Sequence, residues 1–248
     1  KDQIATGFLG ALLLGFIVGY FVKWTKDWKV PEVLKPMMPT FLVPLITTFV
    51  IGVIYIYGMT YPLNALVQLI VGAMYSLNGT SAVLLGLAIG LLAAADFGGP
   101  CSKAATAFTI ALMAEGFYGP NGVFRMCCAI PPLGMGLASF ILRDRYDMAD
   151  RNLGISALFL SFAGITEGAI PFAGKDFKRT WLACAVGTAI AGGIGMLHEI
   201  SSVVAFGGIV AIPGVYQGKL WYVLDMLIGA LIIVGILAIS KPKLDAEE

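Results

Sequence analysis

The sequence has 248 residues, of which 58% are hydrophobic and only 12% are charged, and its mean hydropathy is +0.88. Soluble domains are about half apolar and about a quarter charged, so this composition excludes an ordinary soluble protein. The net charge of +1 gives no reason to expect a nucleic-acid partner. Because the apolar residues fall in long blocks, we predict an all-α, polytopic membrane protein.

Metal and redox chemistry are not indicated by the sequence. It contains one histidine, His198, and four cysteines that form no CxxC pair: Cys101, Cys127, Cys128 and Cys184. We therefore expect no metal-ligand cluster and no cofactor, and we interpret the cysteines as small, buried apolar residues. The chain begins at Lys1 without an initiator methionine or a signal-peptide cleavage pattern, so we expect it to be a fragment that lacks its N-terminal part.

Two long apolar segments open the chain. Residues 4–22 and 37–57 are each long enough to span a bilayer. Four lysines and two tryptophans lie after the first segment, a composition typical of an interfacial belt on the cytoplasmic side: Lys23, Trp24, Lys26, Trp28, Lys29 and Lys35. Residues 61–78 carry apolar side chains on one helical face, which predicts an interfacial amphipathic helix or, alternatively, a short core helix.

Two short apolar arms follow, at residues 81–95 and 104–118. The segment between them contains Gly98, Gly99 and Pro100. About fifteen residues is short for a full span, so we predict that the two arms form a re-entrant hairpin. Residues 123–142 form the next predicted span, which we expect to be broken at Pro131 and Pro132.

A third short arm, residues 153–165, leads to Glu167 and Pro171. It lies between two segments that contain several basic residues, 143–151 and 175–179, and the positive-residue bias places both on the cytoplasmic side. A segment that enters and leaves the membrane on the same side is a re-entrant hairpin. We therefore predict that this arm belongs to a second re-entrant hairpin. Spans at residues 180–197 and 220–240 complete the chain, with a short apolar segment at 201–213 between them.

The two predicted hairpins share a pattern at their tips. Asp96 lies four residues before Pro100, and Glu167 lies four residues before Pro171. Paired interruptions of hydrophobic segments indicate a transporter's binding site, and an ionisable residue at membrane depth indicates a functional role. Two alternatives remain open: Glu167 is a solvated turn residue at the membrane surface, or Asp96 is a buried charge that Lys103 compensates.

The chemistry of these tips suits a neutral polyol. Carboxylates accept strong, charge-assisted hydrogen bonds from hydroxyl groups, and backbone amides that a helix break leaves free can donate. The candidate acceptors are Asp96, Asn121 and Glu167.

The tip motifs resemble those of a known family. GITEGAIPFA at residues 164–173 and DFGGPCSKAA at 96–105 are similar to signatures of the membrane-spanning IIC component of the sugar phosphotransferase system, fructose type. PPLGMGLA at 131–138 and GGIVAIPGV at 207–215 also match. The resemblance covers essentially the whole chain, in order.

The resemblance implies a homodimer that crosses the bacterial inner membrane several times, with further N-terminal spans that are missing from this sequence. Residues 1–78 would form a scaffold part with the dimer contact, and residues 79–248 would bind and move the sugar. A cytoplasmic IIB domain, phosphorylated on cysteine and supplied through enzyme I, HPr and IIA, would phosphorylate the sugar. The chain would then be the membrane component of a sugar phosphotransferase whose phosphoryl donor lies on IIB.

The resemblance also implies roles for single residues. Glu167 would contact the sugar and assist its phosphorylation as the catalytic residue. The remaining residues expected to bind or shape the site are Asp96, Gly98, Gly99, Lys103, Asn121, Thr166 and Gly168.

The chain departs from the family pattern at two positions. Ser102 stands where the family usually has asparagine, and Phe206 stands where it often has the histidine of Pro-His-Gly-Gly. The second departure leaves the identity of the sugar open. His198 is not at that position, and we interpret it as a helix-end histidine beside Glu199.

Two other function classes are considered beside a group-translocating permease. One is an ion-coupled secondary transporter of a small polar solute, with Asp96 and Glu167 as relays. The other is a non-transporting scaffold or sensor. The energy source separates them, because only group translocation consumes phosphoenolpyruvate and delivers a phosphosugar.

Overall fold

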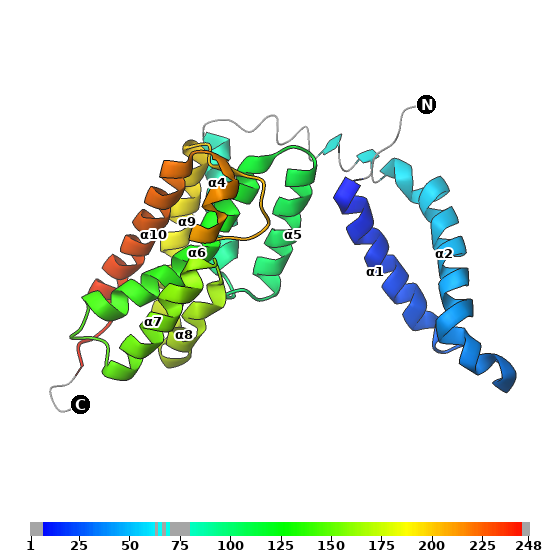
Figure 1. Cartoon of the computed structure of the whole chain (residues 1–248), viewed down its shortest axis with the longest axis horizontal. Helices are drawn as coiled ribbons and strands as arrows, with labels where there is room; N and C mark the ends of the chain where they lie inside the picture. Colours follow the sequence, from blue (N-terminus) through cyan, green and yellow to red (C-terminus); the bar gives the residue numbers. More distant parts are fainter. Residues whose placement is uncertain (1–6, 63, 66–67, 70–79, 245–248) are drawn as a thin grey trace. The chain divides into compact units, whose positions relative to one another are not determined.

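The computed structural model describes residues 7–62, 64–65, 68–69 and 80–244. The chain divides into two compact units, residues 1–76 and 77–248, and each is described by itself. Most of the described residues are helical, which confirms the predicted all-α class (Figure 1). Most of the amphipathic helix predicted at residues 61–78 lies outside the described residues.

The first unit contains α1 (Gly7–Thr25) and a long, irregular second helix. The second helix passes through a 3-10 turn, a π turn, the regular α2 segment and another π turn: η1 (Glu32–Met37), η2 (Met38–Leu42), α2 (Val43–Ile54) and η3 (Tyr55–Met59). Proline cannot donate a backbone hydrogen bond and its ring crowds the preceding turn, which accounts for the irregular start around Pro36 and Pro39. Large apolar side chains such as Phe49 and Tyr57 are exposed along this unit, as lipid-facing side chains would be.

The second unit is a bundle of helices around α6. Its elements are α4 (Thr80–Ala94), α5 (Pro100–Ala114), α6 (Tyr118–Ile141), α7 (Met148–Phe162), η4 (Thr166–Ala169), α8 (Ile170–Lys175), α9 (Phe177–Leu197), β1 (Ser201–Ser202), η5 (Ile209–Gly214), β2 (Val215–Gln217) and α10 (Lys219–Ser240). Helix α6 contacts all five of the other long helices of this unit, α4, α5, α7, α9 and α10. The two short strands pair in antiparallel fashion between α9 and α10.

Four helices in the described part of the chain are long and apolar enough to cross a membrane: Leu34–Pro62, Tyr118–Ile141, Phe177–Leu197 and Lys219–Ser240. They cover the spans predicted at 37–57, 123–142, 180–197 and 220–240. The predicted break at Pro131 and Pro132 is wrong, because α6 continues through both residues. Helix α6 is almost wholly enclosed by its neighbours, and this packing compensates for the missing proline N–H donors.

Close contacts between glycines hold α4 against α9. A Cβ atom at Gly86 would lie 2.3 Å from the carbonyl oxygen of Gly192, and one at Gly90 would lie 2.3 Å from that of Thr188. Small residues spaced four apart let two helix backbones approach each other, and this packing is common in membrane bundles. The high glycine content of the sequence therefore has a specific use in this bundle.

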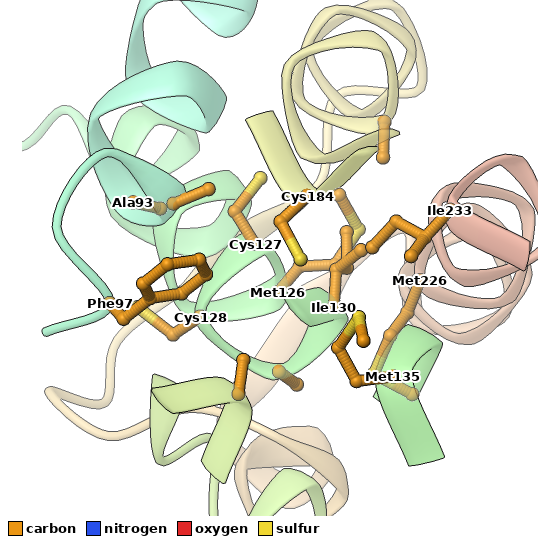
Figure 2. Close-up of a cluster of buried hydrophobic side chains, with 14 of the residues drawn as sticks. Ala93, Phe97, Met126, Cys127, Cys128, Ile130, Met135, Cys184, Met226 and Ile233 are labelled. Atoms are coloured by element: carbon orange, nitrogen blue, oxygen red, sulfur yellow. The ribbon is translucent and has the colours of Figure 1, made fainter. Parts of the chain in front are cut away.

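Three of the four cysteines belong to the buried core. Figure 2 shows Cys127 and Cys128 of α6 and Cys184 of α9 packed among apolar side chains. These three confirm the expected burial, whereas Cys101 is exposed at the start of α5 and corrects that expectation.

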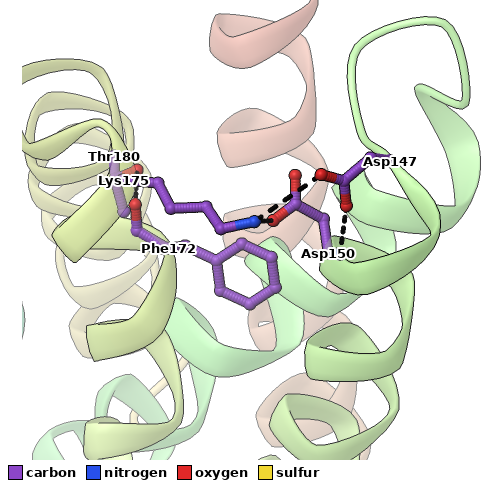
Figure 3. A network of polar contacts seen from close by, with 5 residues as sticks. All are labelled: Asp147, Asp150, Phe172, Lys175 and Thr180. Carbon is purple, nitrogen blue, oxygen red and sulfur yellow. Dashed lines mark hydrogen bonds and ion pairs between the residues drawn. The ribbon is translucent and has the colours of Figure 1, made fainter. Parts of the chain in front are cut away.

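Helices α7 and α8 carry the chain back to the end from which it came. Lys175, at the end of α8, reaches Asp150 in the first turn of α7 with an Nζ–Oδ1 distance of 2.6 Å (Figure 3). Lys175 also lies 3.7 Å from Asp147, whose side chain caps α7 by accepting from the backbone N–H of Asp150. The segment from 147 to 175 therefore folds as a helical hairpin whose two ends are in contact. That it enters and leaves the membrane on the cytoplasmic side stays a prediction.

Thiol labelling tests that prediction. Cysteines introduced by Met148→Cys and Lys178→Cys, at two exposed positions beside the two ends of the hairpin, should react with an impermeant thiol reagent from the same, cytoplasmic face. The measurement uses oriented vesicles and a background without native cysteines. Labelling from opposite faces would make residues 148–178 a full span.

Candidate functional site

The first hairpin tip is the turn between α4 and α5, and Asp96 organises it. Its carboxylate accepts hydrogen bonds from the backbone N–H groups of Gly99 (3.0 Å), Cys101 (2.5 Å) and Ser102 (3.2 Å). A carboxylate in this place satisfies otherwise unpaired donors of the first helical turn and interacts favourably with the helix dipole. Asp96 therefore builds the turn with its side chain.

Lys103 stabilises the same turn, but its partner is a backbone carbonyl and not the carboxylate of Asp96. Its Nζ donates to the carbonyl oxygen of Gly98. The ion pairs found among the described residues do not include Lys103 with Asp96. The backbone at Gly98 has a φ of +96°, a conformation that side chains other than glycine rarely adopt.

The second hairpin tip runs from Gly164 to Gly168 and is fixed to α6. The Thr166 hydroxyl donates to the carbonyl oxygen of Cys128 at 3.0 Å, and Thr166 itself is buried. Gly168 is also buried, and a Cβ atom there would lie 2.9 Å from Cβ of Pro132. Between these two anchored residues Glu167 is exposed, and no donor in the described part of the chain bonds to its carboxylate.

The two tips meet at Glu167 and Gly98. A Cβ atom at Gly98 would lie 2.5 Å from Oε1 of Glu167, so the glutamate carboxylate rests directly on the glycine of the other tip. The Trp181 indole of α9 supports this region by donating to the carbonyl oxygen of Ala95 at 2.8 Å. The fold thus brings together two motifs that are about seventy residues apart in the sequence, and it leaves Glu167 with free acceptor capacity.

A third segment, the loop of residues 205–208, packs against the second tip. A Cβ atom at Gly164 would lie 2.4 Å from the backbone of Gly207, and the Gly208 N–H donates to the carbonyl oxygen of Arg125 at 3.4 Å. The Tyr222 hydroxyl donates to the carbonyl oxygen of Gly208 at 3.1 Å. Phe206, the residue at the family's histidine position, is half exposed on this loop.

The hydrogen bonds of the Asn121 side chain do not go to the two tips. It is fully buried on α6, and its Nδ2 donates to the carbonyl oxygens of Ser202 and Val204, both at 2.9 Å. Its Oδ1 accepts from Nε of Arg125 at 3.2 Å. Its amide therefore fastens α6 to the segment that leads into the 205–208 loop. Its predicted role in sugar binding, like those of the other site residues, stays a prediction.

Two ionisable groups inside the predicted spans were not singled out from the sequence. Arg125 of α6 is 6% exposed and Asp225 of α10 is fully buried. Both are charged residues within an apolar segment, which are costly in a membrane and indicate function. From the sequence we apply this argument to Asp96 and Glu167 but not to these two residues.

His198 caps α9 as expected for a helix-end histidine, but its partner is Asp225. The Nδ1–Oδ2 distance is 2.8 Å, and the imidazole stacks on the Trp221 ring with centroids 3.8 Å apart. Glu199 instead accepts from Nε2 of Gln217 at 2.8 Å. His198 thus ties α9 to α10, which the sequence could not show because the two residues are far apart along the chain.

We expect the charged contact at the ends of α7 and α8 to contribute to stability near neutral pH. A backbone hydrogen bond from Asp150 is the main factor that lowers the pKa of Asp147, and the hydrogen bond to Asp150 raises the pKa of Lys175. The Asp147 contribution is complete above the unfolded carboxylate pKa of about 4 and is lost as the pH falls through its lower folded value. The Lys175 contribution is complete below about pH 10 and is lost as the pH rises through its higher folded value.

Comparison with known proteins gives a consistent result. A family profile described as "Phosphotransferase system, EIIC" matches residues 1–173. The chain is 34% identical over 231 residues to the Fructose-like permease IIC component 2 of Escherichia coli K12, a match that covers 93% of this chain and 64% of the relative. It is 32% identical over 242 residues to the PTS system fructose-specific EIIC component of Haloferax volcanii, covering 97% of this chain and 64% of the relative.

A longer relative shows a different domain arrangement. The chain is 35% identical over 241 residues to the PTS system fructose-specific EIIABC component of Bacillus subtilis, covering 96% of this chain and 38% of that protein. The chain thus spans 64% of the length of the first two relatives and much less of the third. No solved structure matches it.

Proposed function

Because the chain belongs to the phosphotransferase system EIIC family, we propose that it is the sugar-translocating membrane subunit of a phosphoenolpyruvate-dependent phosphotransferase system. The proposed substrate is a fructose-like sugar, because one relative is named a fructose-like permease component and another a fructose-specific component. The observation that carries the proposal is the meeting of the two hairpin tips, where the Glu167 carboxylate rests on Gly98 and has no donor partner among the described residues.

In the proposed mechanism Glu167 accepts a hydrogen bond from a sugar hydroxyl. A hydroxyl bonded to a carboxylate is held in one orientation and becomes more nucleophilic as its proton moves toward the acceptor. The turn capped by Asp96 at Gly99 lies opposite Glu167 in the proposed site. The hydrogen bond from Thr166 to α6 holds the backbone next to Glu167 in place. The site would thus position and activate the hydroxyl that receives the phosphoryl group.

The phosphoryl group is proposed to come from a IIB domain. The Bacillus subtilis relative carries the name EIIABC, which supports an association of A, B and C components. We propose that IIB binds at the face that carries 143–151 and 175–179, with IIA, HPr and enzyme I upstream. Several basic residues of that face are already paired, Lys175 with Asp150 and Arg179 with Asp176, so docking would depend on surface shape as well as on charge.

The proposal extends to assembly and location. We propose a homodimer in the bacterial inner membrane, with residues 1–78 as the scaffold part and 79–248 as the transport part. The exposed apolar side chains of α1, η2 and α2, including Phe16, Phe41 and Phe49, support a lipid or subunit contact for the first part.

The test is reconstitution in proteoliposomes with phosphoenolpyruvate and the soluble partners. We expect radiolabelled fructose, or a closely related sugar, to accumulate inside as a phosphosugar, and accumulation to continue when an ionophore removes the ion gradients. Accumulation of free sugar that stops with the ionophore would identify an ion-coupled transporter instead. Absence of both results would leave only a scaffold or sensor.

The native cysteines should not be needed for phosphoryl transfer. Cys127, Cys128 and Cys184 are buried in apolar surroundings, which disfavours the reactive thiolate, and only Cys101 is exposed. We expect Cys101→Ser to phosphorylate sugar within about twofold of the parent when phosphorylated IIB is supplied, with its initial rate as the measurement. Loss of activity in Cys101→Ser but not in Cys184→Ser would instead make Cys101 part of the transfer route.

A further inference from the structure

Arg125 is a buried cation without a carboxylate partner in the described residues. It lies in the first half of α6, is 6% exposed and has one side-chain hydrogen bond there, from Nε to Oδ1 of Asn121 at 3.2 Å. Its guanidinium carbon also lies 5.2 Å from the centroid of the Phe124 ring. Its Nη2 is completely buried and no acceptor in the described part of the chain bonds to it. The buried carboxylate of α10, Asp225, is paired with His198 instead.

Such an arrangement is unfavourable unless something else binds the guanidinium. Charged groups inside proteins are almost always paired, because burying an isolated charge costs several kcal/mol. A hydroxyl group would satisfy one N–H but would leave the positive charge uncompensated. A carboxylate would satisfy both requirements.

The side of the guanidinium that has no acceptor among the described residues also fits a carboxylate in its geometry. Asn121 accepts from Nε, so the outer part of the guanidinium, where the buried Nη2 has no acceptor among the described residues, is the part left to bind a further group. Two parallel N–H groups match the two oxygens of a carboxylate, and this bidentate recognition distinguishes arginine from lysine.

Arg125 is close to the two-tip site. Its carbonyl oxygen accepts from Gly208, whose loop packs on Gly164 of the second tip. One helical turn further along α6, the carbonyl of Cys128 accepts from Thr166, the residue before Glu167. The arginine therefore lies on the stretch of α6 that supports Glu167, one turn toward the N-terminal end of that helix.

We propose that Arg125 binds a carboxylate of the transported solute, so that the substrate is an acidic sugar held between Arg125 and Glu167. This rests on the proposed function, because it assumes that the two-tip site binds the transported sugar. Glu167 would accept from the hydroxyl that becomes phosphorylated, and Arg125 would bind the charged group elsewhere on the same molecule.

The test is calorimetric binding to the full chain in lipid nanodiscs at pH 7. The probes are fructose and two carboxylates with the same carbon skeleton, 2-keto-D-gluconate and D-fructuronate, oxidised at opposite ends. We expect at least one acid to bind at least tenfold more tightly than fructose. Arg125→Met should weaken binding of that acid about ten- to hundredfold, the loss expected for a charge-assisted hydrogen bond, and change fructose binding by less than twofold.

The variants separate recognition from folding. Arg125→Met removes an uncompensated buried charge, so the melting temperature of the ligand-free protein should stay the same or rise. Arg125→Lys keeps the charge without the planar pair of donors and should also lose affinity for the acid. The control Arg143→Met removes a positive charge from an exposed loop and should bind all three probes as the parent does.

Two results would overturn the inference. One is fructose binding at least as tightly as both acids in the parent. The other is equal weakening of all probes in Arg125→Met and Arg125→Lys, which would make Arg125 a structural residue. Phosphorylation of fructose with no preference for acids refutes the inference alone, whereas acid binding without phosphoenolpyruvate-dependent transfer refutes the proposed function alone.

Discussion

Replacing Glu167 with glutamine should weaken sugar binding about ten- to hundredfold and slow phosphorylation by a further factor of about a hundred or more. The first loss is that of one charge-assisted hydrogen bond, about 1.5–3 kcal/mol. The second is the typical contribution of general-base assistance. Glutamine keeps the size of the side chain, and the exposed carboxylate of Glu167 has no donor partner in the described residues, so the bundle should fold normally.

The measurement combines calorimetric binding with single-turnover phosphorylation by phosphorylated IIB. The sugar is whichever the parent phosphorylates, and chromatography should first show that the variant has the same oligomeric state. Glu115→Gln is the matched control, because it makes the same chemical change at the end of α5. Binding and phosphorylation at parental levels in Glu167→Gln would reduce Glu167 to a solvated turn residue and remove it from the site.

Replacing Gly98 with alanine should abolish most of the activity as well, for a steric reason. The added methyl group would lie 2.5 Å from Oε1 of Glu167, so the carboxylate or the turn must move. The φ of +96° at Gly98 adds backbone strain of about 1–3 kcal/mol in any residue with a Cβ atom. We expect sugar phosphorylation to fall more than tenfold, with a lower melting temperature.

A matched control and a double variant identify the cause of that loss. A Cβ atom added at Gly174 of α8 would have no neighbouring atom within 4 Å, so Gly174→Ala should keep full activity. If the clash with the carboxylate contributes to the instability of Gly98→Ala, truncating its partner in Gly98→Ala/Glu167→Ala should recover part of the melting temperature. Parental activity in Gly98→Ala would contradict the contact between the two tips.

Local pattern was enough to predict the class and the tip motifs. Apolar blocks of about twenty residues give spanning helices wherever the chain folds in lipid, because every backbone polar group must be satisfied internally. The spacing of Asp96 from Pro100 and of Glu167 from Pro171 likewise marks both helix breaks in the sequence itself. The motif around Glu167 also led to the family, which the comparisons support.

Other sequence inferences depended on neighbours that are distant along the chain. Helix α6 continues through Pro131 and Pro132 because surrounding helices enclose it, whereas proline alone predicts a break. Cys101 is exposed because it lies at the first turn of α5, although its residue type favours burial.

The residues around Asp96 and Glu167 are sufficient to place both carboxylates beside helix breaks, but the different partners of the two carboxylates depend on the folded structure. Asp96 bonds to three amides within six residues of itself, so its partners follow from the local turn. Glu167 rests on Gly98, and Asn121 bonds to Ser202 and Val204, about eighty residues away. Contacts of this kind arise from packing between elements distant along the chain, and a local pattern of residues carries no record of them.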